Sequence, residues 1–456
     1  MTAPTSRPRP VRRALDELSL PVDGAAVQDL AAAGPDWLAE DRTAAFDAYT
    51  ALPGESNLLY TPYIDLRAAR LEGCHIPTTL GGGRAATELP AGADGLIEIT
   101  EGVLTGAALS PAATTAGVSL RTLPDVLASD PDRAKALLAD AARIPSTDKF
   151  AQLTRALWST GVVLEVPAGV RLDKPIIVRW VLGEPDRALL TRTVVRIGDG
   201  AEASIVEELT ASAATSIATG EAQAFFAGTT EVVVGANATL HLASLQELPS
   251  SVVAIQHRSA DVGEGGSLRW ALAQLGGRLI RSRVDNRLVG DRSSVEQVEI
   301  VFGGEEQVFD LTSYTTHIGR DTTGNLLSKG ALLDRARTYM KGLIVIDRTA
   351  HGTDSFLGEF GMNLSKSARS VAIPSLEIDQ PDCRRAAHSS SVGPIDETQL
   401  FYLESRGIPP DDARKFIVLG FLEPVVARVP LAAARDRLRE LLEEKWDAGL
   451  DGEAAA

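Results

Sequence analysis

Cysteine is almost absent from this sequence, which contains only Cys74 and Cys383 among its 456 residues. Two cysteines cannot form the disulfide framework of a small secreted protein, and they cannot by themselves complete a four-cysteine metal site. Their scarcity fits a reducing compartment. We therefore expect a cytoplasmic protein in which both thiols are structural or incidental, unless another observation gives one of them a role.

The sequence also lacks long apolar runs and an excess of positive charge. No segment approaches the ~20 apolar residues that a membrane-spanning helix needs. The basic stretch at residues 1–15 is not followed by the apolar part of a secretion signal. The 61 acidic residues outnumber the 45 lysines and arginines, so the formal charge is −16, whereas a phosphate-binding surface needs the opposite balance. We expect neither a membrane nor a nucleic acid as a partner.

Enzyme signatures are missing as well. The sequence has no GxxxxGK[ST] phosphate loop, no GxSxG nucleophile motif, no HExxH zinc motif and no CxxC pair. The glycine-rich GGGR at Gly81 and GEGG at Gly263 are better explained as a linker and a turn. The sequence thus predicts a protein that is not itself an enzyme.

What the sequence does contain is a long series of short strand-like segments over residues 161–319. Segments such as VVLEV, PIIVRWVL, TLHLASL and VEQVEIVF are separated by glycine, aspartate and asparagine. Several follow a similar turn of small residues, at Gly198, Val234, Gly263 and Val289. These turns are spaced roughly 25 to 35 residues apart, which is typical of repeat architectures whose units stack.

No helical crossover fits between these strands, so two architectures stay open. One is an antiparallel sandwich, and the other is a right-handed parallel β-helix whose rungs stack on one another. Aromatic residues make up only 5% of the sequence, and stacked rungs leave little room for large side chains. Together with the small residues that recur at the corners, this favours the β-helix.

Helical periodicity flanks the strand-like region on both sides. Residues 11–18 have an amphipathic pattern, apolar residues at helical spacing follow Pro35, and the pattern returns over residues 123–158. Beyond the strands, Asp396 can cap a helix with its carboxylate. Further amphipathic segments follow it to the end of the sequence.

The change from strand to helix falls just after His388. We predict a mainly β protein, with a right-handed parallel β-helix core flanked by α-helical regions. The predicted organisation is an N-terminal helical region with a small mixed subdomain at residues 1–160, the β-helix core at residues 161–390, and a C-terminal helical domain at residues 391–456.

Candidate chemical groups are scattered along the sequence. The histidines, which show no ligand pattern, are His75, His241, His257, His317, His351 and His388. In a β-helix, however, residues far apart in sequence lie ~4.8 Å apart on adjacent rungs, so sequence spacing does not exclude a cluster. The same argument keeps open a second hypothesis. It is a carbohydrate-active β-helix enzyme that uses an acid pair, either Asp310 with Asp321 or Asp379 with Asp382.

Several stretches carry a family resemblance. STDKFAQLTRALWSTGVVLEVPAGVRLDKPI, at residues 146–176, and LLSKGALLDRARTYMKGLIVI resemble the segments that enter and finish a known β-helix. SLEID, the HSSSVG tract at His388, and QLFYLESRGI through ARKFIVLGFLEPVV resemble its C-terminal signature. The family is SufB/SufD, from the Suf iron–sulfur cluster assembly system. The similarity covers about residues 35–429 and implies a β-helix with a role in cluster assembly.

Within that family the sequence is more similar to SufD than to SufB. SufB-like chains carry a cluster-ligand cysteine ahead of the histidine at the seam, whereas the tract NLSKSARSVAIP has none. They also have an EHEA-type motif where this sequence has AAHSSS. A SufB-like scaffold that holds the cluster itself is the alternative.

The SufD resemblance implies a non-ATPase accessory subunit of a SufB–SufC–SufD complex. It would pair with a SufB-like subunit through the β-helix and with a SufC-like ATPase through its C-terminal helices, so ATP is hydrolysed by the partner alone. In isolation, exposed β-helix ends favour a homodimer. His388 matches a histidine implicated in a transient iron–sulfur cluster at the SufB interface, as an iron ligand, and Cys383 is a second candidate. The predicted ATPase-docking residues are Gln399, Leu400, Phe401, Tyr402, Phe416 and Phe421.

The sequence departs from the SufD pattern beside that histidine. Many SufD sequences have Lys-Cys-Ser-His there, whereas this one has Arg385-Ala386-Ala387-His388, and Cys383 stands five residues before the histidine. A QHxD-like motif also appears as Gln307-Val308-Phe309-Asp310, without its histidine. These departures concern the site rather than the fold.

Overall fold

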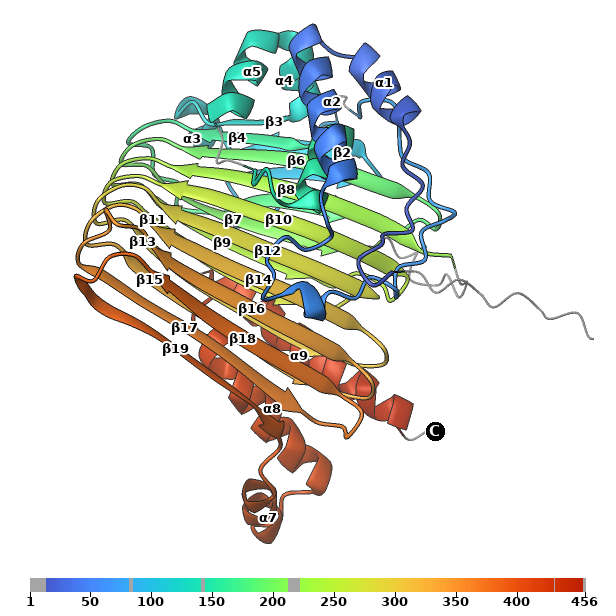
Figure 1. The fold of residues 1–456 in the computed structure, drawn as a ribbon, viewed down its shortest axis with the longest axis vertical. Helices are drawn as coiled ribbons and strands as arrows, with labels where there is room; N and C mark the ends of the chain where they lie inside the picture. The colour runs from blue at the N-terminus through green and yellow to red at the C-terminus, as the bar shows by residue number, and fades with distance from the viewer. Residues whose placement is uncertain (1–13, 82–84, 141–143, 212–221, 430, 454–456) are drawn as a thin grey trace, which may run out of the picture.

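The computed structural model describes residues 14–81, 85–140, 144–211, 222–429 and 431–453. Its centre is a β-solenoid made of two sheets that face each other (Figure 1). Helices cover the outer faces of both sheets. N-terminal helices lie over one sheet, and C-terminal helices lie over the other.

The strands alternate between the two sheets. The ten-stranded sheet contains, in spatial order, β19 (Cys383–Pro394), β17 (Thr353–Asn363), β15 (Thr323–Leu332), β13 (Ser294–Gly303), β11 (Ser267–Gln274), β9 (Thr239–Gln246), β7 (Glu202–Thr210), β5 (Ile176–Val181), β1 (Gly95–Thr100) and β2 (Val103–Leu109). The nine-stranded sheet contains β18 (Arg369–Ile378), β16 (Arg337–Ile346), β14 (Val308–His317), β12 (Leu279–Leu288), β10 (Val252–Val262), β8 (Ala224–Val234), β6 (Ala188–Ile197), β4 (Val162–Val166) and β3 (Ser119–Thr122). From β4 onward each strand pairs in parallel with the strand two positions later. This confirms the parallel β-helix and excludes the antiparallel sandwich.

Turns with left-handed residues align the rungs of the solenoid. Gly200, Asn237, Gly265, Arg292 and Asp321 all have positive φ angles, a conformation that glycine, asparagine and aspartate adopt most readily. The backbone N–H of each donates to a carbonyl of the next turn along the solenoid, at 2.7 to 2.8 Å. The first four of these are the turns that the recurring small residues predicted, and the turn at Asp321 continues the series.

The main hydrophobic core lies between the two sheets. Side chains alternate along a strand, so every second residue points into this space. The core consists mostly of valine, leucine, isoleucine and alanine, with Trp180 and Trp270 among its largest members. The low aromatic content of the sequence agrees with this composition.

The N-terminal helices form a layer on the outer face of the nine-stranded sheet. They are α1 (Gly24–Ala32), α2 (Asp36–Ala51), α4 (Leu123–Ser129), α5 (Pro131–Asp140) and α6 (Lys149–Leu157). The short helix α3 (Pro111–Thr115) instead packs into the interior core through Ala113. Phe150 of α6 packs on Phe225 of β8 and its neighbours in one buried cluster. Between α2 and β1, residues 53–66 cross the same face with the short 3-10 helix η1 (Thr61–Tyr63). We call residues 53–66 the strap.

Two details of the N-terminal region differ from the prediction. Residues 14–18 form no helix, because Leu18 and Leu20 are buried in the outer cluster from a non-helical segment; residues 11–13 lie outside the described part of the chain. The early strands are not separate from the solenoid either. β1 pairs in parallel with β5 and β3 pairs antiparallel with β4, so these strands extend the two sheets.

The C-terminal helices lie on the outer face of the ten-stranded sheet. α8 (Pro410–Val426) and α9 (Ala432–Glu453) pack there through Val418, Leu422 and Trp446, among others. α7 (Glu397–Ser405) projects away from the solenoid (Figure 1). Among the helices of the described residues, none is long and apolar enough to span a membrane.

Candidate functional site

The solenoid ends in two uncovered strands. β19 and β18 are the last strands of their sheets, and each pairs with a single neighbouring strand among those described. Most of their residues are exposed or half-buried, whereas the strands before them are largely buried. The backbone groups on such an edge can pair with another chain. We call this end of the molecule, formed by β18 and β19, the open end (Figure 1).

His388 lies at the mouth of the solenoid interior. It stands opposite Leu357 in the register of β19 with β17. Paired residues of parallel strands point to the same face of the sheet, and Leu357 is completely buried in the interior. His388 therefore projects on the interior side, but no further rung covers it and its side chain is exposed. An accessible imidazole there can bind a metal ion or donate a hydrogen bond.

Cys383 is held away from His388. It begins β19 opposite Thr353, and the register shifts at the next residue. Its side chain packs at the margin of a small apolar cluster that includes Leu326 and Ile344. Five residues of extended strand separate it from His388, which is ~16 Å at ~3.3 Å per residue. The structure does not bring the two candidate ligands together, and they cannot bind one metal ion jointly in this arrangement.

The two arginines after Cys383 attach the last strand to the rungs before it. Arg384 pairs with Asp321, and Arg385 lies 2.6 Å from a carboxylate oxygen of Asp354. Each pair is largely exposed, so each contributes at most about 1 kcal/mol. The tract that departs from the SufD pattern therefore adds two surface ion pairs to the backbone pairing that holds β19 on β17.

A second candidate surface lies on the projecting helices. Asp396 accepts a hydrogen bond from the backbone N–H of Thr398 at 2.8 Å, so it caps α7 as predicted. No residue of α7 is buried. Phe401 is 69% exposed, Tyr402 56% and Phe416, on α8, 59%. We call these three residues the aromatic arm. Large exposed aromatic groups are typical of surfaces that bind other proteins.

The remaining predicted docking residues divide between two environments. Gln399 is exposed and Leu400 is half-buried. Phe421 instead packs toward the solenoid, where its ring centre lies 4.5 Å from Nζ of Lys329 and its carbonyl accepts a hydrogen bond from that amine at 2.7 Å. Phe421 thus helps to attach α8 to β15 and is not part of the aromatic arm.

The acidic pairs considered from the sequence do not face each other across a groove. Asp310 is 4% exposed and lies 2.6 Å from Nζ of Lys341, whereas Asp321 sits at an exposed turn beside Arg384. Asp379 and Asp382 are both exposed, in the turn between β18 and β19. In the described ranges, no group of three or more His, Cys, Asp or Glu residues is arranged to hold a metal ion.

The interior carries a polar row that sequence reasoning missed. Glu207, Glu299 and Glu359 occupy the same position on β7, β13 and β17, and the row ends at Ser390 on β19. Burial raises the pKa of Glu299 to about 7 and that of Glu359 to about 8. The available signal was the recurrence of glutamate inside apolar strand segments, as in IVEEL, VEIVF and LGEFG. The row places buried carboxyl groups in the interior, and Glu359 on β17 is the member nearest the open end.

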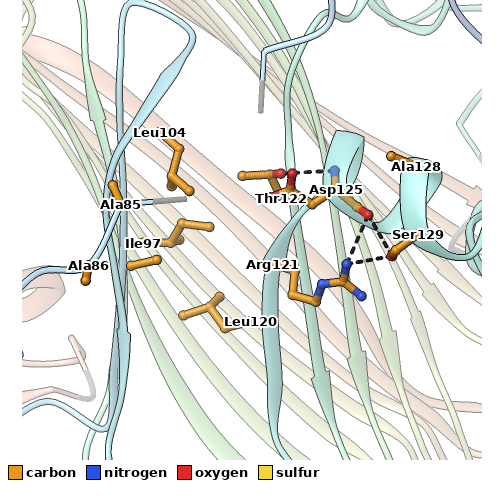
Figure 2. Close-up of a pocket in the computed structure, with 11 residues that line it drawn as sticks. Ala85, Ala86, Ile97, Leu104, Leu120, Arg121, Thr122, Asp125, Ala128 and Ser129 are labelled. Carbon is orange, nitrogen blue, oxygen red and sulfur yellow. Dashed lines mark hydrogen bonds between the residues drawn. The ribbon is translucent and has the colours of Figure 1, made fainter. Parts of the chain in front are cut away.

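A cavity of about 660 Å³ lies at the opposite end of the solenoid (Figure 2). Apolar side chains of β1, β2 and β3 form one part of its wall. Arg121 lies on the other part, where its Nη2 donates to the carbonyl of Asp125 at 3.0 Å and to Oγ of Ser129 at 2.7 Å. The hydrogen bonds drawn there connect β3 to α4. The cavity is remote from His388 and belongs to a different surface.

The family model described as SUF system FeS cluster assembly, SufBD core domain, matches residues 180–421, more than half of the chain. The chain belongs to the SufBD family. The matched span of this SufBD-family chain begins in β5 and ends in α8, so it includes the open end, His388 and most of the aromatic arm's helices.

Curated relatives place the chain closer to the SufD branch. It is 30% identical over 298 residues to the iron–sulfur cluster assembly protein SufD of Bacillus subtilis (strain 168), covering 65% of this chain and 67% of that protein. It is 28% identical over 295 residues to SufBD family proteins of Staphylococcus haemolyticus and Staphylococcus aureus (strain USA300), covering 64% of this chain. The chain spans 62% of the length of each staphylococcal relative. The chain is SufD-like, as its sequence signature predicted.

Proposed function

We propose that this chain is the SufD-like, non-ATPase subunit of a SufB–SufC–SufD complex that supports iron–sulfur cluster assembly in the cytoplasm. The observation that carries the proposal is the open end. Two strands with unpaired edges stop the solenoid of a SufBD-family chain, and one accessible histidine stands at its mouth. A SufB-like subunit pairs with these edges in the proposed complex.

His388 takes part in assembly of a transient cluster at that junction. The cluster is cargo that passes to other proteins. A neutral imidazole is a suitable ligand for iron, and the exposed position of His388 leaves it free to meet groups of the partner. Cys383 is excluded from joint ligation by its distance along β19, so the remaining ligands come from the partner.

The aromatic arm is the proposed docking surface for a SufC-like ATPase. This chain's sequence has no phosphate-binding loop, so ATP is bound and hydrolysed by that partner. Phe401 and Tyr402 lie on the projecting helix α7 and Phe416 lies on α8, and each of the three side chains is more than half exposed. A projecting arm can transmit movement of the ATPase to the solenoid without disturbing its core.

Replacing Phe401 and Phe416 together with serine is expected to weaken binding of the SufC-like ATPase at least tenfold, because exposed aromatic side chains commonly provide most of the energy of an interface. Affinity is measured by biolayer interferometry with the purified ATPase. Val289→Ser is the matched control, because Val289 is also an exposed apolar residue (37%) but lies in a turn of the solenoid. Unchanged ATPase affinity in the double variant would show that the aromatic arm is not the surface that binds the ATPase.

A further inference from the structure

Two adjacent leucines at the crest of the strap are unusually exposed. Leu58 is 87% exposed and Leu59 is 56% exposed. Burial of a leucine side chain stabilises a protein by about 1.5 to 3 kcal/mol relative to leaving it in water. We call these two residues the leucine knuckle. Exposed apolar side chains indicate a binding surface when the fold keeps them exposed, so the contacts around the two leucines decide their meaning.

Hydrogen bonds hold the knuckle in a defined turn. The side-chain carbonyl of Asn57 accepts the backbone N–H of Leu59 at 2.9 Å, and its amide donates to the hydroxyl of Tyr314 at 3.1 Å. Tyr60, on the other side of the knuckle, is completely buried and donates its O–H to the carbonyl of Gly342 at 2.8 Å. The two leucines are therefore displayed on a fixed backbone, and a partner that binds them pays little ordering entropy.

Buried charges anchor the strap from below. The carboxylate of Glu55 is 2% exposed and lies 3.7 Å from Nζ of Lys341 and 3.8 Å from Nη2 of Arg281. Lys341 is completely buried and also contacts Asp310 at 2.6 Å. Desolvating such groups is costly unless their geometry is fixed. The strap is thus attached to the nine-stranded sheet both by the buried Glu55 and by Tyr60.

The knuckle lies beside the open end. Tyr60 and Tyr63, which flank it, contact β16: the former through Gly342 and the latter through the ring of Tyr339, 6.3 Å away between ring centres. Burial raises the pKa of the Tyr60 hydroxyl, and Ser375 of β18, the last strand of its sheet, lies close enough to oppose that rise. Figure 1 shows η1 over these strands. Further exposed apolar side chains lie on the last two strands themselves, namely Ile378 (45%) and Val392 (39%).

We propose that the leucine knuckle is part of the surface that binds the SufB-like subunit. This inference rests on the proposed function, and it adds an apolar contact to the strand edges of the open end. A subunit that pairs with the edge of β18 lies next to the strap, so its own outer layer can cover Leu58 and Leu59. The feature expected on the partner is an apolar patch flanking its last strands. Leu58 and Leu59 lie over the nine-stranded sheet, whereas α8, which carries Phe416 of the aromatic arm, packs on the ten-stranded sheet.

The test replaces both leucines with aspartate, L58D and L59D, and measures binding of the full chain to the SufB-like subunit by isothermal titration calorimetry. The dissociation constant is expected to rise at least tenfold. Because both side chains are exposed, the thermal unfolding midpoint should not change, which separates lost binding from lost folding. V103D is the matched control: Val103 is 54% exposed but lies on β2, at the other end of the ten-stranded sheet. It should bind like the wild type.

Each other outcome contradicts the inference. A double variant that binds the SufB-like subunit within twofold of the wild type would overturn it while leaving the proposed complex intact. Weaker self-association or weaker ATPase binding, with unchanged SufB-like binding, would assign the knuckle to a different occupant and also overturn it. A wild-type chain that does not bind the SufB-like subunit would overturn the proposed function itself.

Discussion

Asp148→Asn is expected to lower the free energy of unfolding by about 3 to 5 kcal/mol, the range found when one partner of a buried ion pair is removed. Asp148 is 2% exposed, and its Oδ2 lies 3.1 Å from Nη2 of Arg281 and 3.0 Å from Nη1 of Arg283. Its Oδ1 accepts the backbone N–H groups of Phe150 and Ala151 and so caps α6. Asparagine can keep the cap but leaves two buried guanidinium groups with less compensating charge.

The pH dependence of this effect has a defined sign. Burial alone would raise the pKa of Asp148, but the charges of Arg281 and Arg283 hold it well below its ordinary value of 3.8. The carboxylate therefore stabilises the folded state fully at pH values above the pKa that Asp148 has in the unfolded chain. This stabilisation is lost progressively as the pH falls below that pKa. The difference between wild type and variant should be constant near pH 7 and shrink below about pH 4.

Urea denaturation at pH 7 and pH 3.5 measures both effects. Asp65→Asn is the matched control, because Asp65 pairs with Arg67 at 2.8 Å nearer the surface, where the arginine side chain is 50% and the aspartate side chain 19% exposed. An exposed pair contributes at most about 1 kcal/mol. If Asp148→Asn also costs less than this, the buried network does not hold the N-terminal layer on the solenoid.

His388→Ala is expected to leave the three-subunit complex assembled and to lower its iron and sulfide content about tenfold or more, the loss typical when a metal site is deprived of a supporting group. The side chain is exposed and lies on the last strand, so its removal creates no cavity in the core. The complex is purified anaerobically, and iron and acid-labile sulfide are quantified per complex.

Two controls define what a loss of cluster means. His241→Ala removes a half-buried histidine of β9, far from the open end, and should retain wild-type loading. Cys383→Ala should also retain it, because Cys383 is the first residue of β19 and lies five residues before His388. Equal iron and sulfide content in the wild type and His388→Ala would mean that His388 has only a structural role. A stoichiometric cluster bound to the isolated chain would instead favour the SufB-like scaffold.

The repeated turns were the most predictable part of the fold. Positive φ at Gly200, Asn237 and Gly265 follows from local chemistry that glycine and asparagine carry in any protein. The strand periodicity between these turns also depends only on neighbouring residues. The absence of helices between the strands left two architectures open, and only the small corner residues and the low aromatic content favoured stacked rungs. The helix that begins after Asp396 was predicted from its cap.

Contacts between distant parts of the chain could not be predicted in the same way. Glu55 meets Lys341, and Asp148 meets Arg281, only because the N-terminal layer folds back across the nine-stranded sheet. No periodicity in the sequence encodes that return. Phe421 illustrates the same limit at the candidate site: helical spacing places it on α8, but only the position of Lys329 on β15 decides that it faces the solenoid.

Purification of the affinity-tagged chain from its native host, without added partners, tests the central claim most directly. Mass spectrometry of the eluted complex should find a SufB-like subunit and a SufC-like ATPase in stoichiometric amounts. The aromatic-arm variant should lose the ATPase, and the leucine-knuckle variant should lose the SufB-like subunit. A chain that elutes with neither protein would contradict the account of the open end as half of a Suf assembly interface.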